Sequence, residues 1–343
     1  MKQKVNIQFR NGLSLEDFQK DVFEPLGLGD IYVFEPSEKP DVVIFGPYGN
    51  DIPPKGDYTR VGYFCENILP DLSICDYAFG IPAESEIKNN KYKRIQWHGF
   101  NPNTLVKNYS DQEIDQILNT KTKFCNFLYS NPVHYREEFF KQLSKYKKID
   151  APGLSMTNMQ RIDNATDNIW EAKRRFLLPY KFTIAFENDV YPGYQTEKLY
   201  DAMRCDSLPI YCGDPNISEV FNTKSFINVP EYVKPNAGFF IKSLEKITHQ
   251  DFADYRPAFY NRLQDRIKRK LKSKGRELKM KLQFNNLDCA PLIEKIIEID
   301  RHQDLYIEYL KQPWFNDNII PQYLSSVNRW IEIFNKTRRW ITL

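Results

Sequence analysis

Short apolar runs separated by longer amphipathic stretches dominate the pattern of this chain. Continuous apolar runs of this kind are typical of strands in parallel sheets, which are buried on both faces. They predict strands at Asp41–Gly46, Thr59–Phe64, Lys123–Ser130, Lys181–Phe186 and Leu208–Cys212. Apolar residues at helical spacing between them predict helices, for example over Leu15–Phe23 and Arg136–Tyr146. Strands that alternate with helices indicate an α/β fold.

The segment from Tyr180 to Pro215 shows this pattern most clearly. A strand over Lys181–Phe186 is followed by a loop over Glu187–Gln195, rich in Asn, Asp, Pro and Gly. Thr196 is a suitable cap for the next helix, which leads to the strand at Leu208–Cys212. Polar residues therefore gather where a strand ends and a helix begins, the place where open α/β sheets bind ligands and helix amides favour phosphate.

Composition narrows the class of protein. The 343 residues are 41% hydrophobic and 27% charged with a net charge of +3, which suits a soluble protein of two domains and gives little reason to expect nucleic-acid binding. The six cysteines and four histidines are scattered and have no metal-ligand spacing, so a disulfide scaffold or zinc site is not expected. Neither Gly-x-Gly-x-x-Gly nor a P-loop sequence occurs.

The ordered residues Phe186-Glu187-Asn188, Tyr194, Thr196-Glu197-Lys198 and Pro209-Ile210-Tyr211-Cys212-Gly213 closely resemble the signature of the α1,3/α1,4-fucosyltransferases, glycosyltransferase family 10. The resemblance covers about residues 58–229 and is to the bacterial type. It implies a GT-B fold, with two Rossmann-like domains facing across a cleft. It also implies an inverting transfer of L-fucose from GDP-fucose to the 3-OH (or 4-OH) of an N-acetylglucosamine or glucose unit, as in N-acetyllactosamine. Such transfers build Lewis-type or lipopolysaccharide O-antigen glycans.

The resemblance suggests a domain plan. Residues 1–120 form an acceptor-binding domain that carries the general base, and residues 121–312 form a domain that binds GDP-fucose. Residues 231–292 are divergent or inserted, and residues 313–343 form an amphipathic tail.

Sugar transfer requires neutralisation of the diphosphate charge that develops on the leaving group. Arg136 offers a bidentate fork and Lys198 a compact charge, and both match cations of the family's pattern. Lys181, before the buried strand, is a second-rank candidate for the same role. Glu197 is expected to accept hydroxyl groups of ribose or fucose, and Asn188 and Tyr194 match donor-contacting positions.

The general base is expected to be Glu66, at the carboxyl end of the strand Thr59–Phe64 and followed by Asp76–Gly80 as in the family. Trp97 and His98 are candidates for contact with the acceptor sugar. A direct inverting attack requires no protein nucleophile, and no Asp-x-Asp occurs, so we expect neither a metal nor a cofactor beyond the donor.

Two basic regions have several possible roles. Residues 262–281 contain ten Lys or Arg and two acids. This composition is typical of an exposed, charged helix, and it would also suit binding to an anionic lipid surface, a phosphorylated glycan carrier or nucleic acid. The tail, with Trp330, Phe334 and Trp340, fits a membrane surface or burial at a domain interface. Without a signal-peptide core or a long apolar run, we expect a cytoplasmic protein that can attach peripherally to the inner membrane face.

Expected partners are GDP-fucose, an oligosaccharide or lipid-linked glycan and an anionic membrane, without nucleic acid. Two alternative functions remain: a transferase of the same fold that uses another sugar nucleotide, such as GDP-mannose, and a non-catalytic protein that binds glycans or nucleic acid through the basic segment.

Overall fold

The computed structural model describes residues 2–97, 100–162, 169–236, 238–256, 259–284 and 287–336. The chain forms two compact units, each built from separate stretches of sequence. Unit 1 comprises Met1–Pro102, Ser243–Arg276 and Pro321–Leu343, and unit 2 comprises Asn103–Lys242 and Glu277–Ile320. Residues 103–120 of the planned first domain thus group with unit 2, and residues 243–276 of the planned second domain group with unit 1. The planned tail, residues 313–343, is divided between the two units at Pro321.

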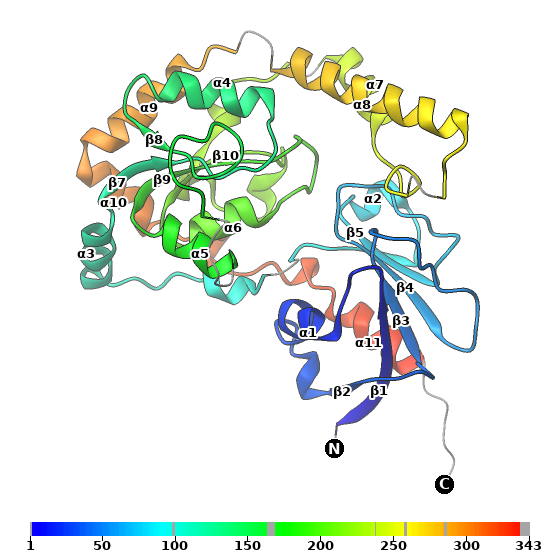
Figure 1. Cartoon of the computed structure of the whole chain (residues 1–343). Helices are drawn as coiled ribbons and strands as arrows, with labels where there is room; N and C mark the ends of the chain where they lie inside the picture. Colours follow the sequence, from blue (N-terminus) through cyan, green and yellow to red (C-terminus); the bar gives the residue numbers. More distant parts are fainter. Residues whose placement is uncertain are drawn as a thin grey trace. The chain divides into compact units, whose positions relative to one another are not determined.

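Unit 1 contains a parallel sheet in the order β2-β1-β3-β4-β5-β6 (Figure 1). Its described strands are β1 (Gln3–Arg10), β2 (Tyr32–Pro36), β3 (Val42–Phe45), β4 (Thr59–Phe64), β5 (Tyr77–Gly80) and β6 (Tyr92–Arg94). All of the pairings are parallel. The unit also contains α1 (Leu15–Phe18), a π-helix (Gln19–Phe23), α2 (Glu84–Ile87) and α11 (Val327–Lys336).

The described part of the tail belongs to the core of unit 1. Trp330 of α11 has no exposed surface, and its ring stacks on Phe79 of β5 with centroids 4.2 Å apart. Phe334 and Ile333 are also fully buried. These apolar side chains are therefore unavailable to a membrane surface. Trp340 lies outside the described residues.

Unit 2 contains a second parallel sheet, in the order β11-β10-β9-β7-β8. Its described strands are β7 (Lys123–Asn126), β8 (Ile149–Asp150), β9 (Tyr180–Phe186), β10 (Leu208–Cys212) and β11 (Ile227–Asn228). Its helices are α3 (Asp111–Thr120), α4 (His134–Leu143), α5 (Ile169–Leu177), α6 (Glu197–Arg204), α9 (Ala290–Arg301) and α10 (Gln303–Lys311). Phe182, Leu208 and Ile210 are fully buried in this sheet, as its continuous apolar runs predict. The α/β class is confirmed.

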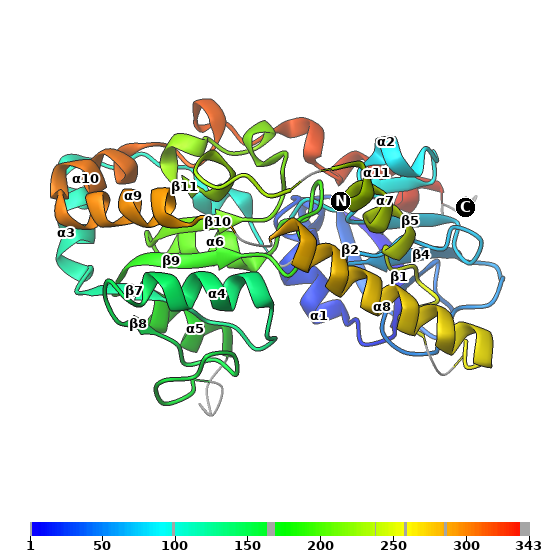
Figure 2. The same cartoon turned by 90° about the horizontal axis from the view of Figure 1, so that it is seen from above.

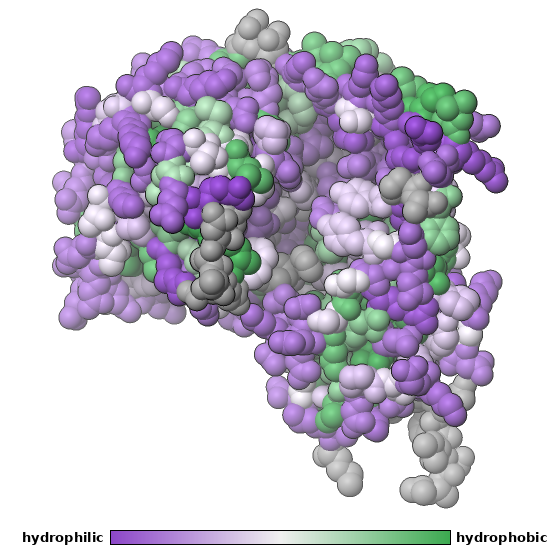
Figure 3. Space-filling model, viewed as in Figure 1, coloured by the Kyte–Doolittle hydropathy of each residue, from purple (hydrophilic) through white to green (hydrophobic). Residues whose placement is uncertain are grey.

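Two helices fall on the boundaries between the units: α7 (Phe239–Thr248) and α8 (Leu263–Gln283). The end of α7 packs closely against α8 (Figure 2), since a Cβ on Gly275 would lie 2.4 Å from Cγ2 of Thr248. No helix in the described part of the chain combines the length and apolarity needed to cross a membrane. Hydrophilic residues predominate on the face drawn in Figure 3, where apolar residues form separate patches.

Candidate functional site

Side chains from α4, α5, α6 and the ends of β7 and β9 line a pocket of about 320 Å³ in unit 2. The pocket lies at the carboxyl ends of parallel strands, where α/β sheets place their ligands. Its described lining is Leu128, Tyr129, Ser130, Asn131, Arg136, Pro152, Gly153, Leu154, Ile162, Ile169, Trp170, Lys173, Asn188, Glu197 and Lys198. Four of the residues predicted for donor binding, Arg136, Asn188, Glu197 and Lys198, are therefore brought together.

Glu187 determines how the loop after β9 joins α6. Its backbone N–H donates to the carbonyl of Cys212 at 2.8 Å, which extends the ladder between β9 and β10. Its fully buried carboxylate accepts hydrogen bonds from the backbone N–H of Thr196 at 2.8 Å and from the Thr196 hydroxyl at 2.7 Å. A Cβ on Gly213 would lie 2.5 Å from Cγ of Glu187, so glycine leaves space for this carboxylate.

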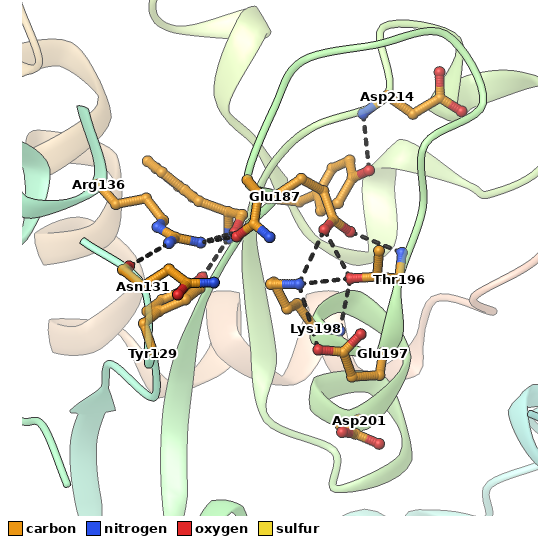
Figure 4. Close-up of polar contacts among 12 residues, drawn as sticks. Tyr129, Asn131, Arg136, Glu187, Thr196, Glu197, Lys198, Asp201 and Asp214 are labelled. Carbon is orange, nitrogen blue, oxygen red and sulfur yellow. Dashed lines mark hydrogen bonds and ion pairs between the residues drawn. The ribbon is translucent and has the colours of Figure 1, made fainter. Parts of the chain in front are cut away.

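Lys198 lies in the first turn of α6, and its side chain is directed at acidic and hydroxyl oxygens (Figure 4). Its Nζ lies 3.4 Å from Oε2 of Glu187 and 3.3 Å from Oε1 of Glu197, and it donates to the Thr196 hydroxyl at 2.9 Å. Burial lowers the pKa of Lys198, but the charges of Glu187 and Glu197 outweigh this effect and raise it. The ammonium group therefore stays charged.

The two carboxylates beside Lys198 differ in environment. Burial raises the pKa of Glu187, although Lys198 opposes this shift. Burial also acts to raise the pKa of Glu197, but Lys198 and Lys173 lower it to about 2. The side chain of Glu197 is 43% exposed, so it presents an ionised carboxylate at the pocket.

Arg136 of α4 is a buried cation surrounded by neutral groups. It has no exposed surface, and its guanidinium donates to the carbonyls of Phe186 at 3.2 Å and Asn131 at 2.8 Å and to Oδ1 of Asn188 at 2.9 Å. Its Cζ lies 3.9 Å from the centre of the Tyr129 ring. No described carboxylate pairs with it, and its Nε has no hydrogen-bond partner among the described residues. A buried charge without a counter-ion is costly, which suggests that an anionic ligand supplies the compensation.

The rim of the pocket is apolar and exposed. Leu154 is 56% and Trp170 57% exposed, and Ile169 begins α5 beside Trp170. Lys173, one turn further along α5, lies 5.6 Å from the Trp170 ring and 2.7 Å from Oδ2 of Asp201. The site therefore combines a cationic floor with a broad apolar edge.

Lys181 does not belong to this group. It is the second residue of β9, and its Nζ donates at 3.0 Å to both the carbonyl and Oδ1 of Asp300. Because a strand rises about 3.3 Å per residue, Lys181 lies about 20 Å along the direction of β9 from Glu187, at the amino end of the strand. The structure therefore does not bring Lys181 together with the other predicted donor-binding residues, and its contact with the diphosphate stays a prediction. Tyr194 lies in the loop before α6, is buried and does not line the pocket.

The residues predicted for acceptor binding belong to unit 1. Glu66 follows β4, is partly exposed and accepts a hydrogen bond at Oε1 from the Tyr48 hydroxyl. Burial raises the pKa of Tyr48, and the hydrogen bond to Glu66 adds to the shift. Trp97 is partly buried, with its ring 6.4 Å from that of Phe100, and His98 lies outside the described residues.

Sequence reasoning missed several residues of the site. Glu187 is part of the family signature, and an acidic residue directly after a buried strand was the available signal. Trp170 and Lys173 come from α5, for which no local motif gave a signal. The described residues contain no group of three or more His, Cys, Asp or Glu side chains placed to hold a metal ion.

Comparisons with known proteins relate this chain to the fucosyltransferases. Residues 118–282 match the profile of glycosyltransferase family 10 (fucosyltransferase), C-terminal domain. The α-(1,3)-fucosyltransferase of Helicobacter pylori is 28% identical over 231 residues, which are 57% of this chain and 46% of the relative. The α-(1,3)-fucosyltransferase B of Drosophila melanogaster is 35% identical over 108 residues, 30% of this chain and 24% of the relative. The chain thus spans less than half the length of these curated relatives.

Solved structures extend the likeness to the whole fold. A crystal structure of an α1,3-fucosyltransferase with GDP-fucose superposes with a TM-score of 0.62 and 19% sequence identity. The alignment covers 100% of this chain and 93% of the chain in that crystal structure. A second crystal structure of an α1,3-fucosyltransferase, with GDP, gives a TM-score of 0.62 and 21% identity over 98% of this chain and 90% of its own. The predicted GT-B fold class is confirmed.

Proposed function

Because the chain belongs to glycosyltransferase family 10, we propose that it transfers L-fucose from GDP-fucose to a glycan hydroxyl group. The observation that carries this proposal is the pair of cations on one pocket: Arg136, buried without a described counter-ion, and Lys198 at the start of α6. A pyrophosphate would supply the counter-charge that Arg136 lacks among the described residues and would accept hydrogen bonds from both cations.

The two cations have different roles in this proposal. The charge of Lys198 is already shared by Glu187 and Glu197, so Lys198 contributes mainly position and directed hydrogen bonds. Arg136 has only neutral partners and gains most when a phosphate binds. Both cations are charged before the reaction, and they stabilise the charge that develops on the leaving diphosphate.

The remaining pocket residues fit the rest of a sugar nucleotide. Glu197, ionised and half-exposed, is suited to accept hydroxyl groups of ribose or fucose. The exposed faces of Trp170 and Leu154 offer an apolar surface to the purine base. Asn188 holds Arg136 through its side-chain oxygen, which leaves its amide N–H groups to donate to the ligand.

The chemical step is a direct displacement at the anomeric carbon. The acceptor oxygen forms a bond to C1 of fucose as the bond from C1 to the phosphate oxygen breaks and GDP leaves. Glu66 accepts the proton that the acceptor hydroxyl loses. Charge on the leaving group is met by side chains, so we propose that the reaction requires no metal ion.

We further propose that the acceptor is an N-acetylglucosamine or glucose unit, fucosylated at its 3-OH or 4-OH, as in N-acetyllactosamine. The names of the Helicobacter and Drosophila relatives give an α-(1,3) linkage, which supports the 3-OH as the position of transfer. A Lewis-type or lipopolysaccharide O-antigen glycan made on the cytoplasmic side of a membrane would contain such a unit.

We place the proposed contact with an anionic membrane on α8 rather than on the tail. Leu263, Ile267 and Leu271 are 70%, 50% and 65% exposed and recur every fourth residue, so they share one face of the helix. Six of the ten cations of residues 262–281 are exposed: Arg262, Arg266, Lys268, Lys270, Lys274 and Lys281. Lys272 and Lys279 are instead held in ion pairs with aspartates. An exposed apolar stripe flanked by Lys and Arg is the pattern of helices that lie on anionic lipid.

The test is GDP release from GDP-fucose in EDTA, with N-acetyllactosamine, lactose, a type 1 chain or no acceptor. We expect acceptor-stimulated release that is lost in Glu66→Gln and retained in Glu38→Gln, a matched change at an exposed residue of unit 1. Turnover with GDP-mannose that exceeds turnover with GDP-fucose would contradict the donor. Binding of glycan or RNA that survives Lys198→Ala, without any release of GDP, would favour the non-catalytic alternative.

A further inference from the structure

Residues 243–276 are joined to the Glu66 loop by backbone hydrogen bonds. Leu69 and Asp251 form a parallel bridge, in which Leu69 N–H donates to the carbonyl of Gln250 at 2.9 Å and Phe252 N–H donates to the carbonyl of Leu69 at 3.1 Å. Phe252 is 2% exposed, and its ring lies 5.1 Å from that of Phe64, the last residue of β4. This part of the divergent region is therefore built into unit 1 beside the proposed base.

Ion pairs fix the turn that follows Phe252. Asp251 and Asp254 exchange hydrogen bonds between side chain and backbone, at 2.9 and 3.1 Å. Lys272 of α8 lies 2.8 Å from Oδ2 of Asp251 and 2.6 Å from Oδ2 of Asp254. On the far side of the turn, Nε of Arg256 donates to the carbonyl of Gly49 at 3.0 Å. Tyr255 is therefore held from both sides.

The anchored turn places Tyr255 beside Tyr48. The two rings lie 6.1 Å apart between centroids, at an interplanar angle of 53°. Tyr48 is 47% exposed, and Tyr255 is partly exposed. Two tilted aromatic faces that are open to solvent thus stand next to the carboxylate of Glu66, to which the Tyr48 hydroxyl donates.

The hydrogen bond from Tyr48 gives the two oxygens of the Glu66 carboxylate different roles. The hydroxyl occupies Oε1 of Glu66, and no described residue donates a hydrogen bond to Oε2. Because burial raises the pKa of Tyr48, its phenol is a neutral donor at physiological pH. One carboxylate oxygen is thus fixed, and the other is available to accept a proton.

We propose that Tyr48 and Tyr255 form the acceptor-sugar site: the Tyr48 hydroxyl positions Glu66, and the two rings bind the apolar face of an uncharged pyranose. This inference rests on the proposed role of Glu66 as the base. The attacking hydroxyl transfers its proton to Oε2 as its oxygen forms the bond to C1 of fucose, and the bond from C1 to the phosphate oxygen breaks. Tyr48 is a positioning residue, since it acts through Glu66.

The test separates the hydroxyl group from the rings. We expect Tyr48→Phe to lower kcat about tenfold, since it removes one hydrogen bond to a charged group, while the KM for N-acetyllactosamine stays the same. Tyr255→Ala should raise the KM for N-acetyllactosamine about tenfold, and Tyr255→Phe should restore it. The KM for GDP-fucose should be unchanged in all three variants, because the donor pocket lies in unit 2.

Tyr58 provides matched controls, because its hydroxyl donates to the carbonyl of Pro54 in an exposed part of unit 1. Tyr58→Phe and Tyr58→Ala should behave like the wild type. The inference is overturned if the wild type transfers fucose and Tyr255→Ala has an unchanged acceptor KM, or if Tyr48→Phe keeps the wild-type kcat. Failure of the wild type to bind GDP-fucose would instead overturn the proposed function. Binding without transfer to any of the three acceptors would overturn the acceptor class and this inference together.

Discussion

Lys198 and Glu187 form an ion pair at the end of β9, with Nζ 3.4 Å from a carboxylate that has no exposed surface. The same carboxylate accepts both hydrogen bonds that Thr196 offers at the start of α6. Glu187 therefore connects the last residue of a strand, the cap of a helix and a cation of the pocket.

Glu187→Gln should destabilise the protein more than Glu197→Gln. The first change leaves Lys198 partly uncompensated in a buried site and weakens the cap of α6, with an expected loss of about 3 kcal/mol in the free energy of unfolding. Glu197 is 43% exposed, so its replacement should cost less stability but weaken GDP-fucose binding. Urea unfolding measures the first effect and calorimetric titration with GDP-fucose the second. Equal losses of stability would contradict a structural role particular to Glu187.

Arg136→Lys should lower the affinity for GDP by about tenfold or more, because an ammonium group cannot replace the three directed hydrogen bonds of the guanidinium. The charge is kept, so this variant separates geometry from electrostatics. Arg175→Lys, on an exposed turn of α5, is the matched control and should bind GDP normally. GDP binding by Arg136→Lys at the wild-type affinity would show that Arg136 is only structural.

The local part of the site could be predicted from the sequence, because its signals lie close together in the chain. Turn residues predicted the loop after Phe186, which contains Asn188. The capping residue Thr196 predicted the start of the helix that carries Glu197 and Lys198. Lys181 lies apart from these residues, because a motif carries no information on which end of a strand a residue occupies, and the direction of β9 decides this. β1 was not predicted, although Val5, Ile7 and Phe9 alternate with polar residues, which is the pattern of a half-buried strand.

Contacts between distant segments could not be predicted. Residues 243–276 belong to the range predicted to diverge from the family, yet Phe252 packs on Phe64 and Tyr255 lies beside Tyr48. The tail pattern fitted either a membrane or a core, and only packing against Phe79 shows that Trp330 is core. Amphipathicity identifies an apolar face but not the surface that it meets.

Stability at low pH should depend on the turn that holds Tyr255. Burial acts to raise the pKa of Asp251, but Lys272 and Lys268 lower it to about 2 from its ordinary value of 3.8. A carboxyl whose pKa is lowered on folding contributes stability above its unfolded pKa, and this contribution is lost as the pH falls toward 2. Asp251→Asn should therefore cost about 1–2 kcal/mol at pH 6 and nearly nothing at pH 2.

Urea unfolding of the wild type and Asp251→Asn across this range measures the difference. Asp71→Asn, at an exposed turn of unit 1, gives the comparison for a carboxylate that makes only local hydrogen bonds. A cost of Asp251→Asn that does not change with pH would mean that its ion pairs with Lys272 and Lys268 contribute little.

The apolar stripe of α8 should carry membrane binding independently of catalysis. Replacing Leu263, Ile267 and Leu271 with Gln removes three exposed apolar side chains and keeps every cation of the helix, so we expect at least a tenfold loss of binding to vesicles containing phosphatidylglycerol. Binding of the wild type should weaken at high salt, because the exposed Lys and Arg of α8 are attracted to the anionic lipid. A sedimentation assay with vesicles measures both effects.

The same substitutions at Ile31 and Ile319, which are 44% and 64% exposed and lie outside α8, should leave binding unchanged. Acceptor-stimulated release of GDP in detergent-free buffer should be the same for all variants. Equal vesicle binding by the triple variant and the wild type would mean that α8 only solubilises the protein.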